Sequence, residues 1–183
     1  MEKPYTLVIF TENKIGILNR VTSLLTQRHI NIESITASES EFNDIHRLTI
    51  VVHVDDDKVQ KVVKQIEKQV EVLKSYCFTD ENTVYAEIAL YKLDLSIIAD
   101  KEKLEAILDK FDLRKTAQAG DYLIVEKTGS KEITNQVFEA LKPFGLYGFV
   151  RSGRVSLSRT AGTFSDHLEQ FESHSKEIIT KYN

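Results

Sequence analysis

The residues best suited to bind a small ligand lie near the N-terminus, in the segment Glu12-Asn13-Lys14-Ile15-Gly16-Ile17. An asparagine side chain offers both an acceptor and a donor, and a glycine lets a ligand approach the backbone without a Cβ in the way. The apolar stripe that starts at Ile17 predicts a helix, and a helix N-terminus attracts anions through its unpaired N–H groups. A free α-amino acid needs this mixture, because its carboxylate requires donors and its ammonium requires an acceptor.

The same residues also have a purely structural interpretation. Asparagine and glycine are common in loops, and Asn13 could serve only to cap the predicted helix. A second asparagine, Asn31, stands at the start of the next predicted strand. Residue types and spacing leave both interpretations open.

Apolar periodicity predicts the elements that position this segment. In the first half of the chain, strands are expected at 5–11, 31–38, 46–54 and 70–78, with helices at 17–25 and after Asp55-Asp56-Asp57. This order, β-α-β-β-α-β, is that of the ferredoxin-like fold. The second half repeats it more faintly, with strands at 84–90, 113–117, 122–127 and 149–158 and helices around 104–111 and 133–141.

We therefore predict an α+β protein with two ferredoxin-like domains. A short polar stretch at 79–83 marks the boundary between a first domain, 1–79, and a second domain, 80–160. The apolar spacing of Phe164, Leu168 and Phe171 predicts a helical tail over 161–183.

Composition argues against several classes of function. The chain has 183 residues with 24 Lys and Arg against 28 Asp and Glu, a net charge of −4 that disfavours nucleic-acid binding. Its one cysteine, Cys77, can form neither an internal disulfide nor a multi-cysteine zinc site. No apolar run approaches the ~20 residues of a membrane span, and the first residues lack the features of a signal peptide. We expect a cytoplasmic protein with no membrane or nucleic-acid partner.

The sequence also contains no recognisable catalytic or metal-binding constellation. His46 and His53 are seven residues apart on a predicted strand, so they point to opposite faces. Glycine-rich phosphate-binding motifs are absent from the sequence. We predict a protein that is not itself an enzyme and that holds no metal.

The motifs, taken in order, resemble the small, regulatory subunit of acetohydroxyacid synthase, also called acetolactate synthase. The pattern Glu12-Asn13-x-x-Gly16-x-Leu18-x-Arg20-Val21 resembles the opening signature of that family. Asn31–Ser34 and Arg47–Ile50 resemble its next two segments. Pro143–Leu146 and Arg151–Arg159 resemble its C-terminal domain, so the resemblance runs from about residue 4 to Arg159.

The resemblance implies an N-terminal ACT domain that forms a homodimer and binds valine, or a related branched-chain amino acid, between the two copies. It implies effector contacts from Asn13, Lys14, Ile15, Gly16 and Ile17 of one domain and from Asn31 and Ile32 of the other. It further implies activation of a catalytic large subunit and feedback inhibition by valine. Thiamine diphosphate, FAD and magnesium would belong to that large subunit, with no cofactor on this chain.

A local surplus of positive charge suggests where a partner could dock. From Lys142 to Ser165 the chain has no acidic residue, so this stretch is basic within an acidic protein. A solvated strand face and an electrostatic docking surface both explain the pattern. The candidate partner-binding residues are Arg20, Arg47, Arg151, Arg154 and Arg159.

Other functions compete with a regulatory subunit. A free-standing ACT-domain sensor would regulate another enzyme or a transporter through the same amino-acid site. An acylphosphatase-like hydrolase would need an arginine in the first loop, where this chain has Lys14. RNA binding on the open sheet face would need outward aromatic residues, whereas the strand at 46–54 is expected to present Arg47, Thr49, Val51 and His53 to solvent.

Overall fold

The computed structural model describes residues 1–159 and 164–169. It divides into two compact units: Met1–Val84 with the described residues from Ser156 onward, and Tyr85–Val155. The first unit contains β1 (Lys3–Glu12), α1 (Ile17–Gln27), β2 (Ile32–Glu39), β3 (Ile45–Val54), α2 (Asp56–Ile66), β4 (Val72–Phe78) and the short helix η1 (Asp80–Asn82).

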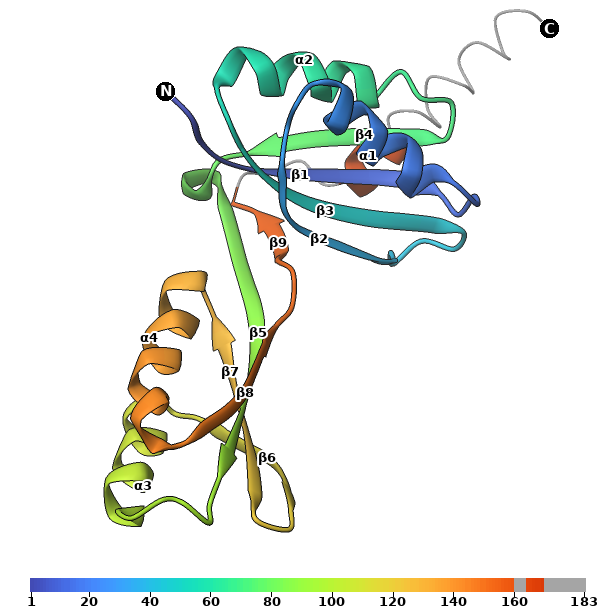
Figure 1. The fold of residues 1–183 in the computed structure, drawn as a ribbon. Helices are drawn as coiled ribbons and strands as arrows, with labels where there is room; N and C mark the ends of the chain where they lie inside the picture. Colours follow the sequence, from blue (N-terminus) through green and yellow to red (C-terminus); the bar gives the residue numbers. More distant parts are fainter. Residues whose placement is uncertain (160–163, 170–183) are drawn as a thin grey trace, which may run out of the picture. The chain divides into compact units, whose positions relative to one another are not determined.

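The first sheet confirms the predicted ferredoxin-like order. Its strands are arranged β2-β3-β1-β4, and each neighbouring pair is antiparallel. Figure 1 shows α1 and α2 lying along one side of this sheet. Because β1 and β2 are both antiparallel to β3, they run parallel to each other, and β2 forms an edge of the sheet.

The residues of β3 that face the helices are those that its alternating pattern predicts. Leu48, Ile50, Val52 and Val54 of β3 are all buried in one apolar cluster with residues of α1 and α2. The two helices contribute stripes at three- and four-residue spacing, as an amphipathic helix requires. These stripes are Ile17, Val21 and Leu25 from α1 and Val59, Val62, Val63 and Ile66 from α2.

The expectation that the other face of β3 points to solvent holds at His53, which is exposed, and is wrong at Thr49 and Val51. Thr49 is 4% exposed and Val51 only 2%. Val8 and Phe10 of β1 are also buried on this side, in a second cluster that includes Phe164. Part of this cover, Phe164 and Leu168, comes from more than 100 positions later in the chain, which a local sequence pattern does not reveal.

Arginine side chains tie the end of the described chain to the first unit. The Arg47 guanidinium donates a hydrogen bond to the carbonyl of Ser156. The Arg159 backbone N–H donates to the Asn82 carbonyl at 2.8 Å, and its Nε donates to the Thr83 carbonyl at 3.2 Å. Residues from Ser156 onward therefore belong with the first unit, whereas the expected second domain extends to residue 160.

The second unit repeats the fold around its own core, which includes Tyr91, Leu93, Val125 and Leu141. Its sheet has the order β6-β7-β5-β8, and β9 also pairs with β5. The elements after η1 are β5 (Thr83–Asp94), α3 (Lys101–Lys110), β6 (Arg114–Ala119), β7 (Tyr122–Gly129), α4 (Lys131–Leu141), η2 (Lys142–Phe144), β8 (Leu146–Arg151) and β9 (Val155–Ser158). The start of β5, before Tyr85, and the part of β9 after Val155 belong to the first unit.

The single strand expected at 149–158 is in fact two strands. β8 ends at Arg151, and Ser152 then accepts the Ile88 backbone N–H on its Oγ at 2.9 Å. The next residues leave the ladder, and the Arg154 side chain is buried with its guanidinium 3.5 Å from the centroid of the Tyr85 ring. This buried cation–π contact lies at the break between the two strands, which periodicity does not reveal.

The tail prediction is met over a short stretch only. Residues 164–169 are helical, while 161–163 and 170–183 lie outside the described residues. Within the described ranges, no helix combines the length and the apolar character needed to span a membrane.

Candidate ligand-binding site

The loop between β1 and α1 is the centre of the candidate site. Gly16 occupies the N-cap position of α1 with φ +88°, and no side chain caps this helix. The interpretation of Asn13 as the helix cap is therefore wrong. A Cβ built on Gly16 would meet no atom within 4 Å, so the space next to this backbone is open to a ligand.

The loop side chains divide into exposed and buried ones. Asn13, Lys14 and Ile15 are exposed, and Ile15 is fully so, at 103%. Ile17 is only 7% exposed and packs in the first core. Ile17 can therefore offer a ligand its backbone but not its side chain, and Ile15 is the apolar side chain available in this loop.

Backbone and ionic contacts hold both ends of the loop. The Asn13 N–H donates to the Asp44 carbonyl at 2.9 Å, and the Glu12 N–H donates to the Glu71 carbonyl at 2.9 Å. The Arg20 guanidinium pairs with the Glu71 carboxylate, and this hydrogen bond holds the pKa of Glu71 below its usual range. Arg20 is thus engaged at the start of β4 and helps to fix α1 against the sheet.

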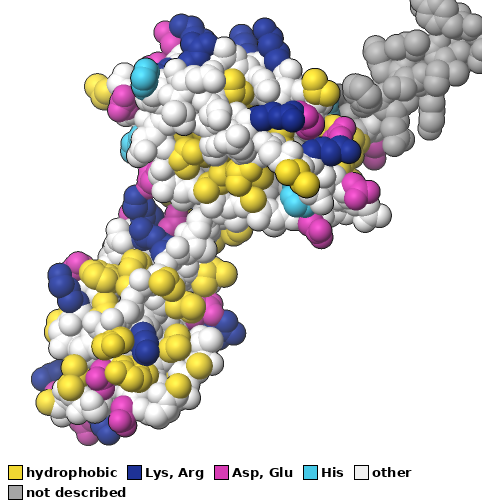
Figure 2. All heavy atoms as spheres, turned by 45° about the vertical axis from the view of Figure 1, so that its right-hand side comes forward, with side chains coloured by type: hydrophobic (Ala, Val, Ile, Leu, Met, Phe, Trp, Pro, Cys, Tyr) yellow, Lys and Arg dark blue, Asp and Glu magenta, His cyan; other side chains and the backbone are white. Residues whose placement is uncertain are grey.

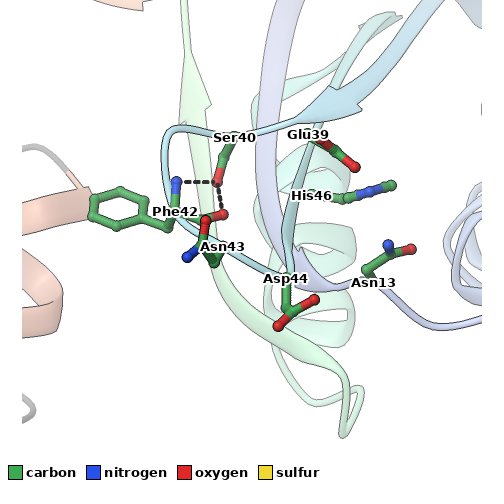
Figure 3. A pocket seen from close by; sticks show the side chains of 7 residues that line it. All are labelled: Asn13, Glu39, Ser40, Phe42, Asn43, Asp44 and His46. Atoms are coloured by element: carbon green, nitrogen blue, oxygen red, sulfur yellow. Dashed lines mark hydrogen bonds between the residues drawn. The ribbon is translucent and has the colours of Figure 1, made fainter.

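A polar pocket of about 340 Å³ adjoins the loop. Figure 3 shows Asn13 near the side chains of His46 and Asp44, while the Phe42 ring points away from Asn13. Two carboxylates and two carboxamides among the lining residues make this surface suited to hydrogen bonding with a polar group. The lining residues are Asn13, Glu39, Ser40, Phe42, Asn43, Asp44 and His46.

Asn31 and Ile32 lie at the opposite end of the first sheet from this loop. Ile32 and Tyr5 both pair with Val52, while Glu39 and Thr11 both pair with His46. Six strand residues therefore separate the two levels, which is roughly 20 Å at 3.3 Å per residue. One chain does not bring Asn31 and Gly16 to the same small ligand.

The candidate partner-binding arginines of the second unit make contacts inside it. Arg151 forms an ion pair with Glu87 at 3.2 Å, and its Nη1 donates to Thr134 and Asn135 at 3.0 and 2.9 Å. Arg154 is buried against Tyr85. Contact between these arginines and a partner stays a prediction, as it does for Arg47, Arg159 and Arg20.

Two further observations concern metal-binding groups and the one cysteine. Among residues 1–159 and 164–169, no group of three or more His, Cys, Asp or Glu side chains is placed to hold a metal ion. Burial raises the pKa of the Cys77 thiol to about 11, so this side chain is a neutral thiol near pH 7.

Known protein families match both halves of the chain. Residues 7–74 match the family model of the AHAS small subunit-like ACT domain, and residues 86–160 match that of the small subunit of acetolactate synthase. The chain is 34% identical over 160 residues to the acetolactate synthase small subunit of Bacillus subtilis, covering 87% of this chain and 91% of that protein.

Two further relatives extend the match. A probable acetolactate synthase small subunit of Archaeoglobus fulgidus is 33% identical over 158 residues, which cover 85% of this chain and 96% of that one. The crystal structure of the acetolactate synthase small subunit from Thermotoga maritima superimposes with a TM-score of 0.79 at 28% identity, covering 87% of this chain and 99% of that chain.

Proposed function

This chain belongs to the family of acetolactate synthase small subunits, and we propose that its ACT domain binds valine or a related branched-chain amino acid and thereby regulates a catalytic large subunit. The observation that carries the proposal is the loop Asn13–Gly16, which is exposed and leaves open space beside Gly16 at the start of α1. We place this chain and its large subunit in the cytoplasm.

The proposed contacts follow from the chemistry of the loop. The N–H groups at the start of α1 donate to the ligand carboxylate, and the Asn13 carboxamide accepts from its ammonium group. Ile15 supplies an apolar contact for a branched side chain. Lys14 adds positive charge near the ligand carboxylate. Its Nζ also lies 3.8 Å from Oε2 of Glu12.

The remaining contacts come from a second copy of the chain in this proposal. Two β2 edges paired antiparallel bring the start of one strand opposite the end of the other. Asn31 and Ile32 of the partner then lie near the loop, a meeting that the ~20 Å separation forbids within one chain. Exposed apolar side chains at Ile15, Leu18 and Ile35 support an interface beside this edge.

Regulation requires that the ligand distinguish two states of the assembly. Valine shifts the large subunit toward an inhibited state only if it binds the complex in that state more tightly, typically with a coupling of about 1–3 kcal/mol. In its absence the small subunit activates the large one. Thiamine diphosphate, FAD and magnesium reside on the large subunit in this proposal, and the present chain supplies regulation alone.

Calorimetric titration with valine, leucine and isoleucine tests the ligand site. We expect saturable binding to the native chain and none to Gly16→Asp, because a carboxylate there would repel the ligand's own. Gly120→Asp is the matched control, since Gly120 also has positive φ and no atom within 4 Å of an added Cβ. Binding to Gly16→Asp with native affinity would refute the site.

A pull-down with the tagged full chain separates the regulatory subunit from the free-standing sensor. Recovery of a thiamine-dependent large subunit supports the proposal, and recovery of a different enzyme or a transporter favours the sensor. If the chain alone binds no amino acid, the titration is repeated with that large subunit present.

A further inference from the structure

The helical residues 164–169, here called the C-terminal strap, lie on the side of the first sheet that α1 and α2 leave open. Phe164 is 3% exposed and its ring stacks on Phe10, with centroids 4.1 Å apart and planes within 3°. Leu168 packs against the same cluster. Both matching family models end before the strap, so the family resemblance does not account for it.

The strap also contacts the turn that connects β2 to β3. The Phe164 ring meets the Phe42 ring edge to face, with centroids 5.5 Å apart. In Figure 3 the Phe42 ring points toward the pale red ribbon of the strap. The turn is closed internally, because the Phe42 N–H donates to Ser40 Oγ at 3.1 Å and the Ser40 N–H donates to the Ile45 carbonyl at 2.9 Å.

The same turn holds the proposed effector loop. Asp44 has a left-handed backbone, with φ 59°, and its carbonyl accepts the Asn13 N–H at 2.9 Å. Asn13 and the turn residues together line the polar pocket. Phe164 therefore contacts this turn at Phe42, and two residues further along the same turn Asp44 accepts the Asn13 N–H.

Arg47 makes a second contact with the Phe10 ring, on which Phe164 of the strap stacks. The Arg47 guanidinium lies over the Phe10 ring, 5.6 Å from its centroid, and also donates to the Ser156 carbonyl. Burial lowers the pKa of Arg47, as expected for a cation enclosed by this cluster. The Phe10 ring thus contacts both Arg47 and Phe164.

We propose that the strap sets the affinity of the effector loop by positioning the β2–β3 turn. Phe164 and Phe42 are positioning residues and touch no ligand themselves. Without their contact the turn samples more conformations, and the ligand binds only the fraction in which Asn13 is correctly placed. This inference rests on the proposed function of the loop Asn13–Gly16.

The test uses the full chain with Phe164→Ala, Phe42→Ala and the double variant. Valine affinity is measured by calorimetry, and backbone amide exchange is measured at Asn13 and through the turn. We expect each single variant to weaken valine binding by about three- to tenfold and to speed exchange of the Asn13 amide. The double variant should lose little more than one single variant, because both changes break the same contact.

Phe144→Ala is the control, since Phe144 packs only partly buried against the core of the second unit. It should leave valine affinity and Asn13 exchange unchanged. If Phe164→Ala fails to fold, the Phe42→Ala variant tests the proposal. Phe42 is half-buried, and its substitution leaves the Phe10–Phe164 stack intact.

Native exchange and native affinity in a folded variant would overturn the proposal, and so would fully additive losses in the double variant. If the native chain and its complex bind no valine, the proposed ligand site fails on its own account. The exchange rate of the Asn13 amide then decides the strap separately: acceleration in the variants supports it, and an unchanged rate rejects it.

Discussion

The two units repeat one arrangement of strands and helices but differ on the second face of the sheet. In the first unit Val51, on the face away from the helices, is 2% exposed, and on the same face Val8 and Phe10 are buried in a cluster that includes Phe164. In the second unit Val150 lies on the corresponding face, because it pairs with Leu90 outside the core, and it is 62% exposed. Figure 2 shows hydrophobic side chains gathered on the surface of this unit.

The difference shows that repeating the fold does not determine whether the second face of the sheet is covered. One face of each sheet is covered by the helices that the repeat itself encodes. The other face depends on residues outside the repeat, which the first unit obtains from the C-terminal part of the chain. A strand buried on both faces carries apolar or small residues throughout, as β1 does from Tyr5 to Phe10.

The largest expected effect contrasts one substitution on each second face. Val51→Lys places a charge without a partner beneath the cover of the first sheet and should cost at least about 3 kcal/mol of unfolding free energy. Val150→Lys, at an exposed site, should change it by less than about 0.5 kcal/mol. Urea unfolding of both variants measures the contrast. Equal costs would show that the two faces are equally covered, or equally open, in solution.

A smaller effect contrasts two arginine–glutamate pairs. Arg151→Met leaves the Glu87 carboxylate, with a side chain only 7% exposed, without its cation and should cost about 2–3 kcal/mol. Arg20→Met in the first unit breaks the more exposed pair with Glu71 and should cost less. The urea midpoints of the two variants decide this.

Adding Glu87→Gln to Arg151→Met should recover part of the loss, because the buried charge is then gone. A stable Arg151→Met chain that no longer binds the large subunit would instead assign Arg151 to docking.

The effect that is smallest near neutral pH is a loss of stability at alkaline pH, which should begin at different pH values in the two units. Burial raises the pKa of Cys77 in the first unit to about 11 and that of Tyr91 in the second to about 12. Each group loses its proton more easily in the unfolded state, at about pH 8.5 for cysteine and about pH 10 for tyrosine. Stability is therefore complete below those values and falls as the pH rises through them.

We expect the first unit to weaken at a lower pH than the second. Amide exchange in β1 and in β5, followed from pH 8 upward after correction for intrinsic rates, measures the order. Cys77→Ala should remove the earlier loss and leave the later one. A simultaneous loss in both strands would contradict the assignment.

Much of the fold follows from local patterns. The alternation in β3 identifies the face toward the helices, and the stripes of α1 and α2 identify their buried residues. The segment Glu12–Ile17 also draws attention by residue type alone, since asparagine and glycine at a strand-to-helix turn suit an anionic group. The inferences about β3, α1 and α2 are confirmed because each depends on residues within one element, whereas the role of Glu12–Ile17 stays a prediction.

Other features of the candidate site required three dimensions. Glu71 as the partner of Arg20 is 51 positions distant and nothing in the spacing points to it. The burial of Arg154 over Tyr85 turns an apparently basic surface residue into a packed one. The missed turn residues, Phe42 and Asp44, have no signal beyond an ordinary polar turn.

By itself the sequence determined the order of the elements, the helix-facing cores, the effector-loop candidate and the resemblance to a family. Only the tertiary structure decided that part of the second face of the first sheet is buried, that Asn31 lies far from Gly16 within one chain, and that Phe164 contacts Phe42. The physical reason is the distance along the sequence between the residues that interact. Periodicity records which side of an element is apolar, whereas cover, distance and pairing depend on segments that only the folded chain brings together.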